Sequence, residues 1–454
     1  MPVPLHDPRW LSLGEGYSDV VAAARFPKHL LRWRNDRAAE EVGLHTLGAD
    51  EWARRFARFE AFEGNLPAPH ALRYHGHQFQ HYNPSLGDGR GFLYAQVRDT
   101  RGRLMDLGTK GSGTTPWSRG GDGRLTLKGG LREVLATEML EALGVDTSRS
   151  LSLFETGESL ERHDEPSPTR AAVLVRLSHG HVRFGTFQRL AYGRDKARAE
   201  RLLAYTIEHY FPGLELDPKA FLTAVCAAVA RTCGAWIGAG FVHGVLNTDN
   251  MNVTGESFDY GPWRFAPVFD PAFVAAYFDE NGLYAYGRQP DAVWWNLHAL
   301  QDALRLLGAP LDGALDGFGR EWHAGLRAVT LRRLGVSSLG EAADTALTDA
   351  VYTYLGATRA PIDRFFHDWW GGPTSRAATG LAAWPDATRV REVVEAYAPR
   401  PGVAERVGGL EETPVTALIT EVERVWDPIA ARDDWAPFER HVRAIRALGA
   451  RLGD

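Results

Sequence analysis

Cysteine is scarce in this chain: its 454 residues include two, Cys226 and Cys233. They lie in a stretch with helical apolar spacing, where the rise per residue separates them by roughly 10 Å. That separation is too long for a disulfide, so both are predicted to be small core side chains. The sequence therefore excludes a disulfide framework and fits a reducing, cytoplasmic compartment.

Long apolar runs and an excess of basic charge are also missing. The sequence has no run of about 18 apolar residues, so no transmembrane helix is expected. Its first ten residues lack the basic and then apolar pattern of a signal peptide. Lys and Arg total 51 against 57 Asp and Glu, a net charge of −6. We therefore expect neither a membrane nor nucleic acid as a partner.

Apolar periodicity predicts a strand-containing part followed by helical parts. Strand-like runs at 91–99 and 103–110 flank a DTRG turn and predict a hairpin. A helix over 127–143 and strands over 150–155 and 172–177 follow. Other helices are expected within 28–63, over 196–210, 217–238 and 292–307, and in the tail beyond 330, with breaks near 371–373 and 400–409.

The length and this order of elements predict an α+β fold with more than one lobe. We expect the two-lobed layout of protein kinases with helical extensions at both ends. The predicted parts are an N-terminal helical extension (1–69), a glycine-rich nucleotide lobe with strands (70–195), a helical catalytic lobe (196–330) and a C-terminal helical extension (331–454).

A glycine-rich stretch, LGDGRG at 86–91, precedes the first strand of the hairpin. Gly87 and Gly89 would let main-chain N–H groups approach phosphate, and Arg90 would add positive charge. A glycine-rich turn explains the same residues. Lys110 ends the second strand and Glu133 lies on the next helix, the order in which kinases place a phosphate-binding lysine and its glutamate. A solvated lysine and a surface glutamate are the alternative.

The sequence HGVLNTDN at 243–250 has the frame of a kinase catalytic loop, His-Gly-Asp-Leu-x-x-x-Asn, but Val245 replaces the aspartate. Asp249 is the nearest carboxylate that could accept a proton from a hydroxyl, and a loop cap is the alternative. Asn250, and Asp259 in an Asp-Tyr-Gly sequence, offer the hard oxygen atoms that Mg²⁺ prefers. Ordinary turns are the alternative, and the order of the two segments after His-Gly and a long helix favours the metal site.

Two further stretches are candidates for nucleotide contacts. Arg176 and Arg183 would clamp triphosphate oxygens if both point inward, although exposure is the usual fate of arginine. In WSRGGDGR at 117–124, Asp122 either contacts nucleotide or belongs only to a turn.

Several of these segments together resemble the selenoprotein O family: YHGHQFQHYNPSLGDGR, KGSGTTPWSRGGDGR, LREVL, VRFGTF, HGVLNTDNM with DYGP, FDPAF, YAYGRQP and WNLHAL, roughly over residues 70–310. The resemblance implies a kinase-like fold that binds ATP in a flipped orientation with Mg²⁺ or possibly Mn²⁺. It also implies transfer of AMP to Ser, Thr or Tyr of proteins, possibly of the chain itself, with release of pyrophosphate.

Carried over by motif, the resemblance implies a role for each candidate. Asp249 would be the proton acceptor, Asn250 and Asp259 the metal ligands, and Glu133 the partner of the lysine. Nucleotide contacts would come from Gly87, Gly89, Arg90, Lys110, Asp122, Gly123, Arg176 and Arg183.

The chain also departs from the family's pattern. Its C-terminal RALGARLGD has no cysteine or selenocysteine, and Val274-Ala275-Ala276 stands where many members have Cys-Asn-His. Gly129 and Gly130 replace two serines, and the tail beyond about 330 lacks the usual motifs. A divergent branch without that redox control is expected. Ordinary phosphoryl transfer and a non-catalytic, ATP-binding scaffold stay open as alternatives.

Overall fold

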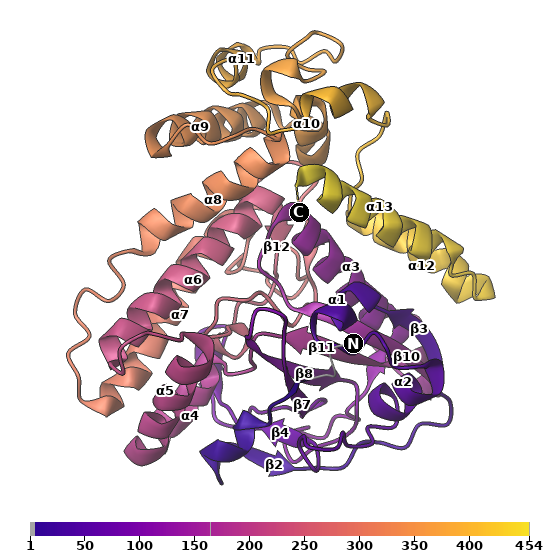
Figure 1. Ribbon diagram of the computed structural model, residues 1–454, viewed down its shortest axis with the longest axis vertical. Coiled ribbons are helices and arrows are strands. Elements are labelled where there is room, and N and C mark those ends of the chain that lie inside the picture. The colour runs from indigo at the N-terminus through magenta and orange to yellow at the C-terminus, as the bar shows by residue number, and fades with distance from the viewer. Residues whose placement is uncertain (1–4, 164, 454) are drawn as a thin grey trace.

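The computed structural model describes residues 5–163 and 165–453 as a mixed α/β protein built on an antiparallel nine-stranded sheet (Figure 1). The expected mixture of helices and strands is confirmed. The sheet runs in the order β2 (Ser18–Val20), β4 (His70–Leu72), β7 (Leu93–Arg98), β8 (Leu104–Lys110), β11 (Thr169–Ser178), β10 (Arg149–Leu160) and β3 (Leu30–Arg34). β1 (Leu5–His6) pairs with β7, and β9 (Leu125–Thr126) with β11.

The predicted hairpin and the two strands that follow it form the centre of this sheet. β7 and β8 pair in antiparallel register, and the Asp99 N–H donates to the Arg103 carbonyl across the turn at 3.0 Å. β11 pairs with β8 so that Leu174 lies opposite Lys110. This pairing fixes Lys110 at the end of a central, buried strand, next to the loop that leads to α3 (Leu127–Leu143).

Alternate residues of β11 face two separate apolar layers, as the period of a strand requires. Val173, Val175 and Leu177 belong to the core beneath α1 (Asp36–Glu41) and α2 (Ala49–Phe56). Ala172 and Leu174 belong to the core on the other face, together with residues of α3. The sheet is therefore covered on both faces.

The expectation of an all-helical N-terminal extension is wrong for the segments that form strands. Leu30–Arg34 form β3, which pairs with β10 and is itself the edge strand of the sheet, and Ser18–Val20 form β2 at the opposite edge. Pairing with an open sheet edge satisfies main-chain groups, and this tertiary effect outweighs local propensity. The helices of residues 28–63 are confined to α1 and α2. The domain boundaries at 69, 195 and 330 stay predictions.

The helices expected in the middle of the chain are confirmed within about three residues at either end. They are α3, α5 (Lys196–Tyr210), α6 (Pro218–Ala239) and α7 (Gln289–Leu304), which continues as a 3₁₀ turn to Leu307. The side chains of Thr126, Asp195 and Asp217 cap α3, α5 and α6. Not expected were α4 (Phe184–Tyr192), and the short pairs β5 (Gly76–Gln78) with β6 (His81–Asn83) and β12 (Phe241–Val242) with β13 (Arg264–Phe265).

Helix α6 is long and apolar enough to cross a membrane by length and composition alone. Within its most apolar window, however, 67% of the residues are buried inside the protein. It packs along α8 (Phe318–Leu334) on one flank of the molecule (Figure 1). Cys226 and Cys233 lie on it as buried free thiols, which confirms their prediction as core residues.

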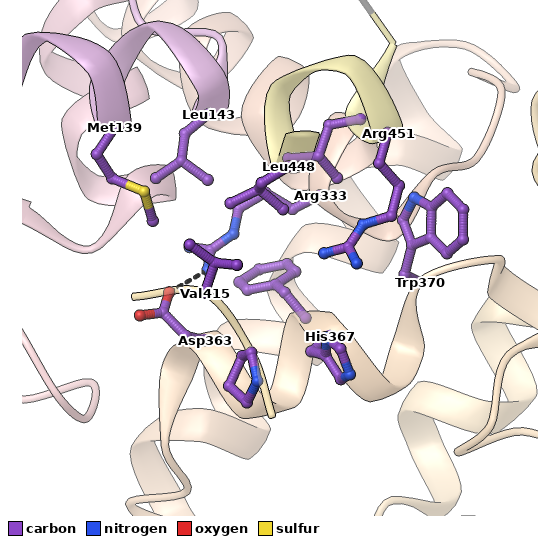
Figure 2. A pocket seen from close by; sticks show the side chains of 12 residues that line it. Met139, Leu143, Arg333, Asp363, His367, Trp370, Val415, Leu448 and Arg451 are labelled. Atoms are coloured by element: carbon purple, nitrogen blue, oxygen red, sulfur yellow. Dashed lines mark hydrogen bonds and ion pairs between the residues drawn. The ribbon is translucent and has the colours of Figure 1, made fainter. Parts of the chain in front are cut away.

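The C-terminal part is helical, as expected: α9 (Glu341–Thr358), α10 (Ile362–Trp369), α11 (Thr388–Val394), α12 (Ile419–Arg432) and α13 (Ala436–Leu452). Helices α9 to α11 share their own apolar cluster, and α13 returns to pack on α3. Figure 2 shows where α3, α8, α10 and α13 meet, beside the buried ion pair between Arg333 and Asp363 at 2.7 Å. The cavity left there, about 20 Å³, has room for little more than one water molecule.

The contact between α6 and α8 depends on glycine at two facing positions. A Cβ on Gly325 would lie 2.0 Å from the Arg231 carbonyl oxygen, and one on Gly234 would lie 2.0 Å from that of Trp322. Main chain cannot yield as a flexible side chain can, so the two helices would have to separate.

We therefore expect Gly325→Ala to destabilise the protein by about 2 kcal/mol or more, because overpacked interfaces cost on this scale. Gly319→Ala in the same helix meets open space and is expected to be neutral or stabilising by up to about 1 kcal/mol. Urea unfolding of both variants measures the difference. Equal stability of the two variants would contradict the close helix contact.

Candidate functional site

A cavity of about 600 Å³ opens between the glycine-rich loop, the end of β8, the segment 117–124 and the loop at 243–250. Seven basic and four acidic side chains line it, so its walls favour anions. The basic residues are Arg90, Lys110, Arg119, Arg124, Arg162, Arg176 and Arg183, and the acidic ones are Asp88, Asp122, Asp249 and Asp259.

The carboxylate of Asp259 lies at the centre of the basic groups. Its Oδ1 is 2.9 Å from Lys110 Nζ and 3.4 Å from Arg176 Nη1, and its Oδ2 is 3.3 Å from Arg183 Nη1. Burial alone would raise the pKa of Asp259, but Lys110 and the two arginines more than offset it and hold that pKa well below its usual range. Asp259 therefore stays ionised and keeps three cations together.

Lys110 forms a second ion pair, with Glu133 of α3. Its Nζ is 2.5 Å from Glu133 Oε2, and Arg176 Nη1 is 3.5 Å from the other oxygen of the same carboxylate. The predicted pairing is therefore present in the geometry. Glu138, one turn further along α3, faces away and pairs with Arg446 of α13 at 2.7 Å.

Asp249 lies in a 3₁₀ turn, η2 (Thr248–Asn250), and lines the cavity. Its Oδ1 is buried and has no hydrogen-bond partner among the described residues. Burial raises the pKa of the Asp249 carboxyl to about 6, and the nearby Arg183 cation opposes that rise only in part. A buried carboxylate oxygen without a donor is well suited to accept a proton from a bound molecule.

The turn that carries Asp249 is fastened on both sides. Thr248 Oγ1 accepts from the His77 N–H and donates to Gln188, each at 2.7 Å. Asn247 accepts from the Phe79 N–H at 3.0 Å. The hairpin of β5 and β6 and helix α4 thus hold the turn in place.

Arg183 links this turn to the rest of the site. Its Nη1 donates to the Asp249 main-chain carbonyl at 2.6 Å, and its Nη2 lies 3.4 Å from Asp88 Oδ1. The guanidinium stacks over the rings of Tyr74 and Phe258 at 4.5 and 4.8 Å. The Nε atoms of Arg183 and Arg176 are buried without a hydrogen-bond partner among the described residues. Buried donors of this kind indicate a missing acceptor, such as a phosphate oxygen.

The glycines of the site are required by its own packing. A Cβ on Gly87 would lie 2.4 Å from Trp117 Cγ, and Gly89 packs against the Trp117 carbonyl. Gly123 has φ +68° and packs on the main chain of Gly113. Asp122 pairs with Arg162 at 2.8 Å and lies at the exposed mouth. The packing of the loop therefore accounts for these glycines without a nucleotide. The same glycines place main chain of the loop beside the cavity.

Two predicted residues do not line the cavity. Glu133 acts behind Lys110, and Asn250 donates its side-chain N–H to the Val245 carbonyl at 3.0 Å. That bond engages the amide N–H of Asn250 and leaves its amide oxygen as a hard donor, in addition to the Asp259 carboxylate, which lines the cavity together with those of Asp88, Asp122 and Asp249. The chemistry of this pair fits a divalent cation. Among residues 5–163 and 165–453, no group of three or more His, Cys, Asp or Glu is placed to hold one, so phosphate oxygens would have to complete the ligand set.

Several lining residues were not predicted as contacts from the sequence, among them Tyr74, Asp88, Arg119 and Arg162. Asp88 lies inside LGDGRG and could have been found there. Arg162 follows β10 in a polar loop, and no local pattern connects it with a site assembled mainly from other segments.

Comparison with known proteins identifies the family of the chain. A sequence model of the SelO family, described as protein adenylyltransferase SelO, matches residues 4–378. The chain belongs to this family. Relatives named protein nucleotidyltransferase YdiU are 46% identical in Gloeobacter violaceus, over 97% of this chain and 95% of the relative, and 43% identical in Synechocystis sp., over 97% and 98%. One from Cereibacter sphaeroides is 37% identical, over 95% and 91%.

The resemblance to the selenoprotein O family is therefore confirmed, and so is the predicted enzyme class, a nucleotidyltransferase that acts as a protein adenylyltransferase. The match also extends further than the motifs at 70–310. The SelO family model begins at residue 4, and alignments over 97% of the chain include most of the tail beyond 330.

The segment that delivers Arg183 to the site depends on a buried glutamate. Glu256 Oε2 accepts from the His179 N–H at 2.9 Å, and Asn252 donates to the Gly180 carbonyl at 2.7 Å. Burial, together with the charge of nearby Asp146, raises the pKa of Glu256 to about 8, and Arg149 opposes this in part.

Folding therefore raises the pKa of Glu256 from about 4.5, and the folded protein holds a proton that the unfolded chain has lost. Stability should fall as pH rises from 4.5 to 8, by up to about 1.4 kcal/mol per pH unit. Glu256→Gln keeps the acceptor and removes this loss, so its melting temperature should gain on the wild type as pH rises. The exposed Glu280→Gln is the matched control. Parallel melting curves for wild type and Glu256→Gln would contradict the assignment.

Proposed function

We propose that this SelO family member uses the cavity around Asp259 to bind ATP and transfers AMP to hydroxyl groups of proteins, with release of pyrophosphate. The observation that carries the proposal is the presence of a preformed cation cluster and the Asp249 carboxylate in the lining of one cavity. The kinase-like two-lobed fold belongs to the same proposal. The order glycine loop, Lys110, Glu133, the loop at 243–250 and Asp259 supports it.

We propose further that ATP lies flipped relative to kinases, with its terminal phosphates at Lys110, Arg176 and Arg183. The buried, unpartnered Nε atoms of the two arginines support this placement, because they supply donors deep in the site. The α-phosphate would then be the phosphate presented to an acceptor hydroxyl. Gly87, Gly89, Arg90, Asp122 and Gly123 would contact the rest of the nucleotide near the mouth.

In the proposed step, the Asp249 carboxylate takes the proton of the acceptor hydroxyl as the hydroxyl oxygen forms a bond to the α-phosphorus. The bond from the α-phosphorus to the bridging oxygen breaks, and its electron pair leaves with pyrophosphate. Lys110, Arg176 and Arg183 stabilise the charge that develops on this leaving group. Asp259 keeps these three cations in position before the nucleotide arrives.

We propose Asp259 and Asn250 as the protein ligands of Mg²⁺ or Mn²⁺. The bound cation would screen phosphate charge during transfer. In the structure both oxygens of Asp259 face basic groups, so phosphates must first draw those cations away. Metal and nucleotide should therefore bind together rather than separately.

The finer aspects of the biology also stay proposals. We expect the acceptors to be Ser, Thr or Tyr side chains, with those of the enzyme itself among them. The free, buried Cys226 and Cys233 are compatible with a cytoplasmic location. The net charge of −6 gives no support to nucleic acid as a substrate.

We expect label from ATP to appear on protein when it is carried by the α-phosphate and not when it is carried by the γ-phosphate. The enzyme alone and a lysate both serve as acceptors, with Mg²⁺ or Mn²⁺ present, and autoradiography reads the result. Label from the γ-phosphate alone would indicate a kinase despite Val245. ATP binding without label from either position would favour a scaffold that binds ATP without catalysis.

Asp249→Asn should lower the transfer rate at least about a hundredfold, because it removes a general base. ATP affinity and melting temperature should change little, since Arg183 is held by the main-chain carbonyl, which asparagine keeps. Initial rates measure the loss of transfer, and calorimetry measures ATP affinity and melting temperature. Asp302→Asn, at an exposed position of α7, is the control. Full activity of Asp249→Asn would exclude this residue as the base.

Titration calorimetry with Mn²⁺ should show weak binding to the free enzyme and much tighter binding once a non-hydrolysable ATP analogue is present. The Asp259→Asn variant should still bind the analogue in EDTA, because Lys110, Arg176 and Arg183 remain. Added Mn²⁺ should not raise the affinity of this variant for the analogue any further. Tight Mn²⁺ binding without nucleotide would contradict this coupling.

A further inference from the structure

A second cavity of about 480 Å³ adjoins the proposed nucleotide site. The two share the side chains of Arg90, Lys110, Arg124 and Arg162, so they form one continuous surface. The second cavity is bounded by the first turn of α3, the segment 260–264 directly after Asp259, and α12. Asp249, Arg176 and Arg183 line the first cavity and not the second.

The charge of this cavity is poorly balanced. Seven basic side chains line it against two carboxylates, those of Glu165 and Glu423. Glu423 is engaged by Lys128 at 2.7 Å.

Two cations in this wall depend on main-chain acceptors. Arg132 and Arg264 both donate to the Trp263 carbonyl, at 3.0 and 3.1 Å, and neither has an ion-pair partner among the described residues. Burial lowers the pKa of Arg132 to about 10, and the nearby Arg264 adds to this effect. The carboxylates of Glu423 and Glu165 oppose this lowering only in part. Two neighbouring cations whose hydrogen bonds reach only main-chain carbonyls would be stabilised by an external anion.

The rim of the cavity is aromatic and reaches the catalytic turn. Tyr277 is 82% exposed and Phe278 44% exposed, unusual values for such side chains. Phe278 lies edge-on to Phe79, with ring centroids 6.1 Å apart, and the Phe79 N–H donates to Asn247, two residues before Asp249. A chain bound along this rim would therefore pass close to Asp249.

We propose that the second cavity binds an acidic segment of the acceptor protein, whose carboxylates lie a few residues from the hydroxyl that receives AMP. This inference rests on the proposed function and names its substrate class. Charge complementarity selects carboxylates at Arg132 and Arg264, and Tyr277 and Phe278 supply apolar contact for the intervening chain. An extended chain spans about 3.3 Å per residue, so flanking acidic residues can reach the cavity while the hydroxyl faces Asp249.

The test uses two fluorescent peptides that differ only in the residues around a single tyrosine, one with glutamates and one with glutamines. We expect the wild-type enzyme to bind the acidic peptide about tenfold more tightly by fluorescence anisotropy, and to transfer AMP to it with a correspondingly lower KM. Arg264→Ala should abolish this preference without changing kcat or the affinity for the glutamine peptide.

Lys128→Ala serves as a second variant, and melting curves check the folding of both. Arg305→Ala, an exposed arginine that does not line this cavity, is the matched control and should keep the preference. Equal affinity for the two peptides, or an acidic preference unchanged in both Arg264→Ala and Lys128→Ala, would overturn the inference.

The two proposals fail separately. Binding of the acidic peptide that depends on Arg264, without AMP transfer to any acceptor, would retain the docking site and reject the proposed reaction. AMP transfer to both peptides with equal KM would retain the reaction and reject the docking site.

Discussion

The site depends on one carboxylate placed among three buried or nearly buried cations. The three cations come from three elements: Lys110 from β8, Arg176 from β11 and Arg183 from the start of α4. Without Asp259 they would repel one another in a buried site of low dielectric constant, which would destabilise the fold. Asp259 reaches them from a left-handed conformation, φ +64°, which aspartate tolerates better than most residues. Asp259 therefore holds the three cations close together without a bound phosphate. If the nucleotide binds as proposed, its phosphates take the place of Asp259 at cations that are already close together, and this preorganisation would lower the cost of binding.

Glu133 also neutralises part of the positive charge of Lys110 and Arg176, and the C-terminal helices support its position. Glu133 lies on α3, whose inner face packs on the sheet and whose outer face is covered by α13. Arg446 of α13 forms two hydrogen bonds with Glu138 at 2.7 and 2.8 Å and lies 4.9 Å from the Trp33 ring of β3. Lys128 at the start of α3 pairs with Glu423 of α12. The C-terminal helices therefore act as a support that fixes the helix carrying Glu133, and the N-terminal strand β3 completes the same contact.

The sequence predicted those parts whose signal is local. Helix α3 begins and ends as expected because its apolar spacing lies between Thr126, an N-cap, and Gly144, a left-handed C-cap. The hairpin of β7 and β8 was equally clear from its turn. β3 was missed because LLRWR has no strong preference of its own and becomes a strand only against β10. In the site, Lys110, Asp249 and Asp259 were found through motifs, whereas Arg162 was not, since only the fold brings it from the β10–β11 connection to the cavity. The motif alone also could not show that Asn250 faces Val245 rather than the cavity.

Val245 stands where the catalytic-loop pattern of kinases has an aspartate, and other contacts hold the loop around it. His243 donates its Nε2–H to the Phe258 carbonyl, 3.0 Å away, and Asn250 donates to the Val245 carbonyl, so side chains at both ends of the loop fix its backbone. The nearest carboxylate is that of Asp249, four residues after Val245, and the Asp249 main-chain carbonyl accepts a hydrogen bond from Arg183. Asp249, the proposed base, and Arg183, the proposed phosphate-binding arginine, are thus joined by a direct hydrogen bond that restrains their separation. Such coupling suits a reaction in which the proton leaves the acceptor while pyrophosphate charge grows on the arginine side, because a single geometry serves both ends of the displacement.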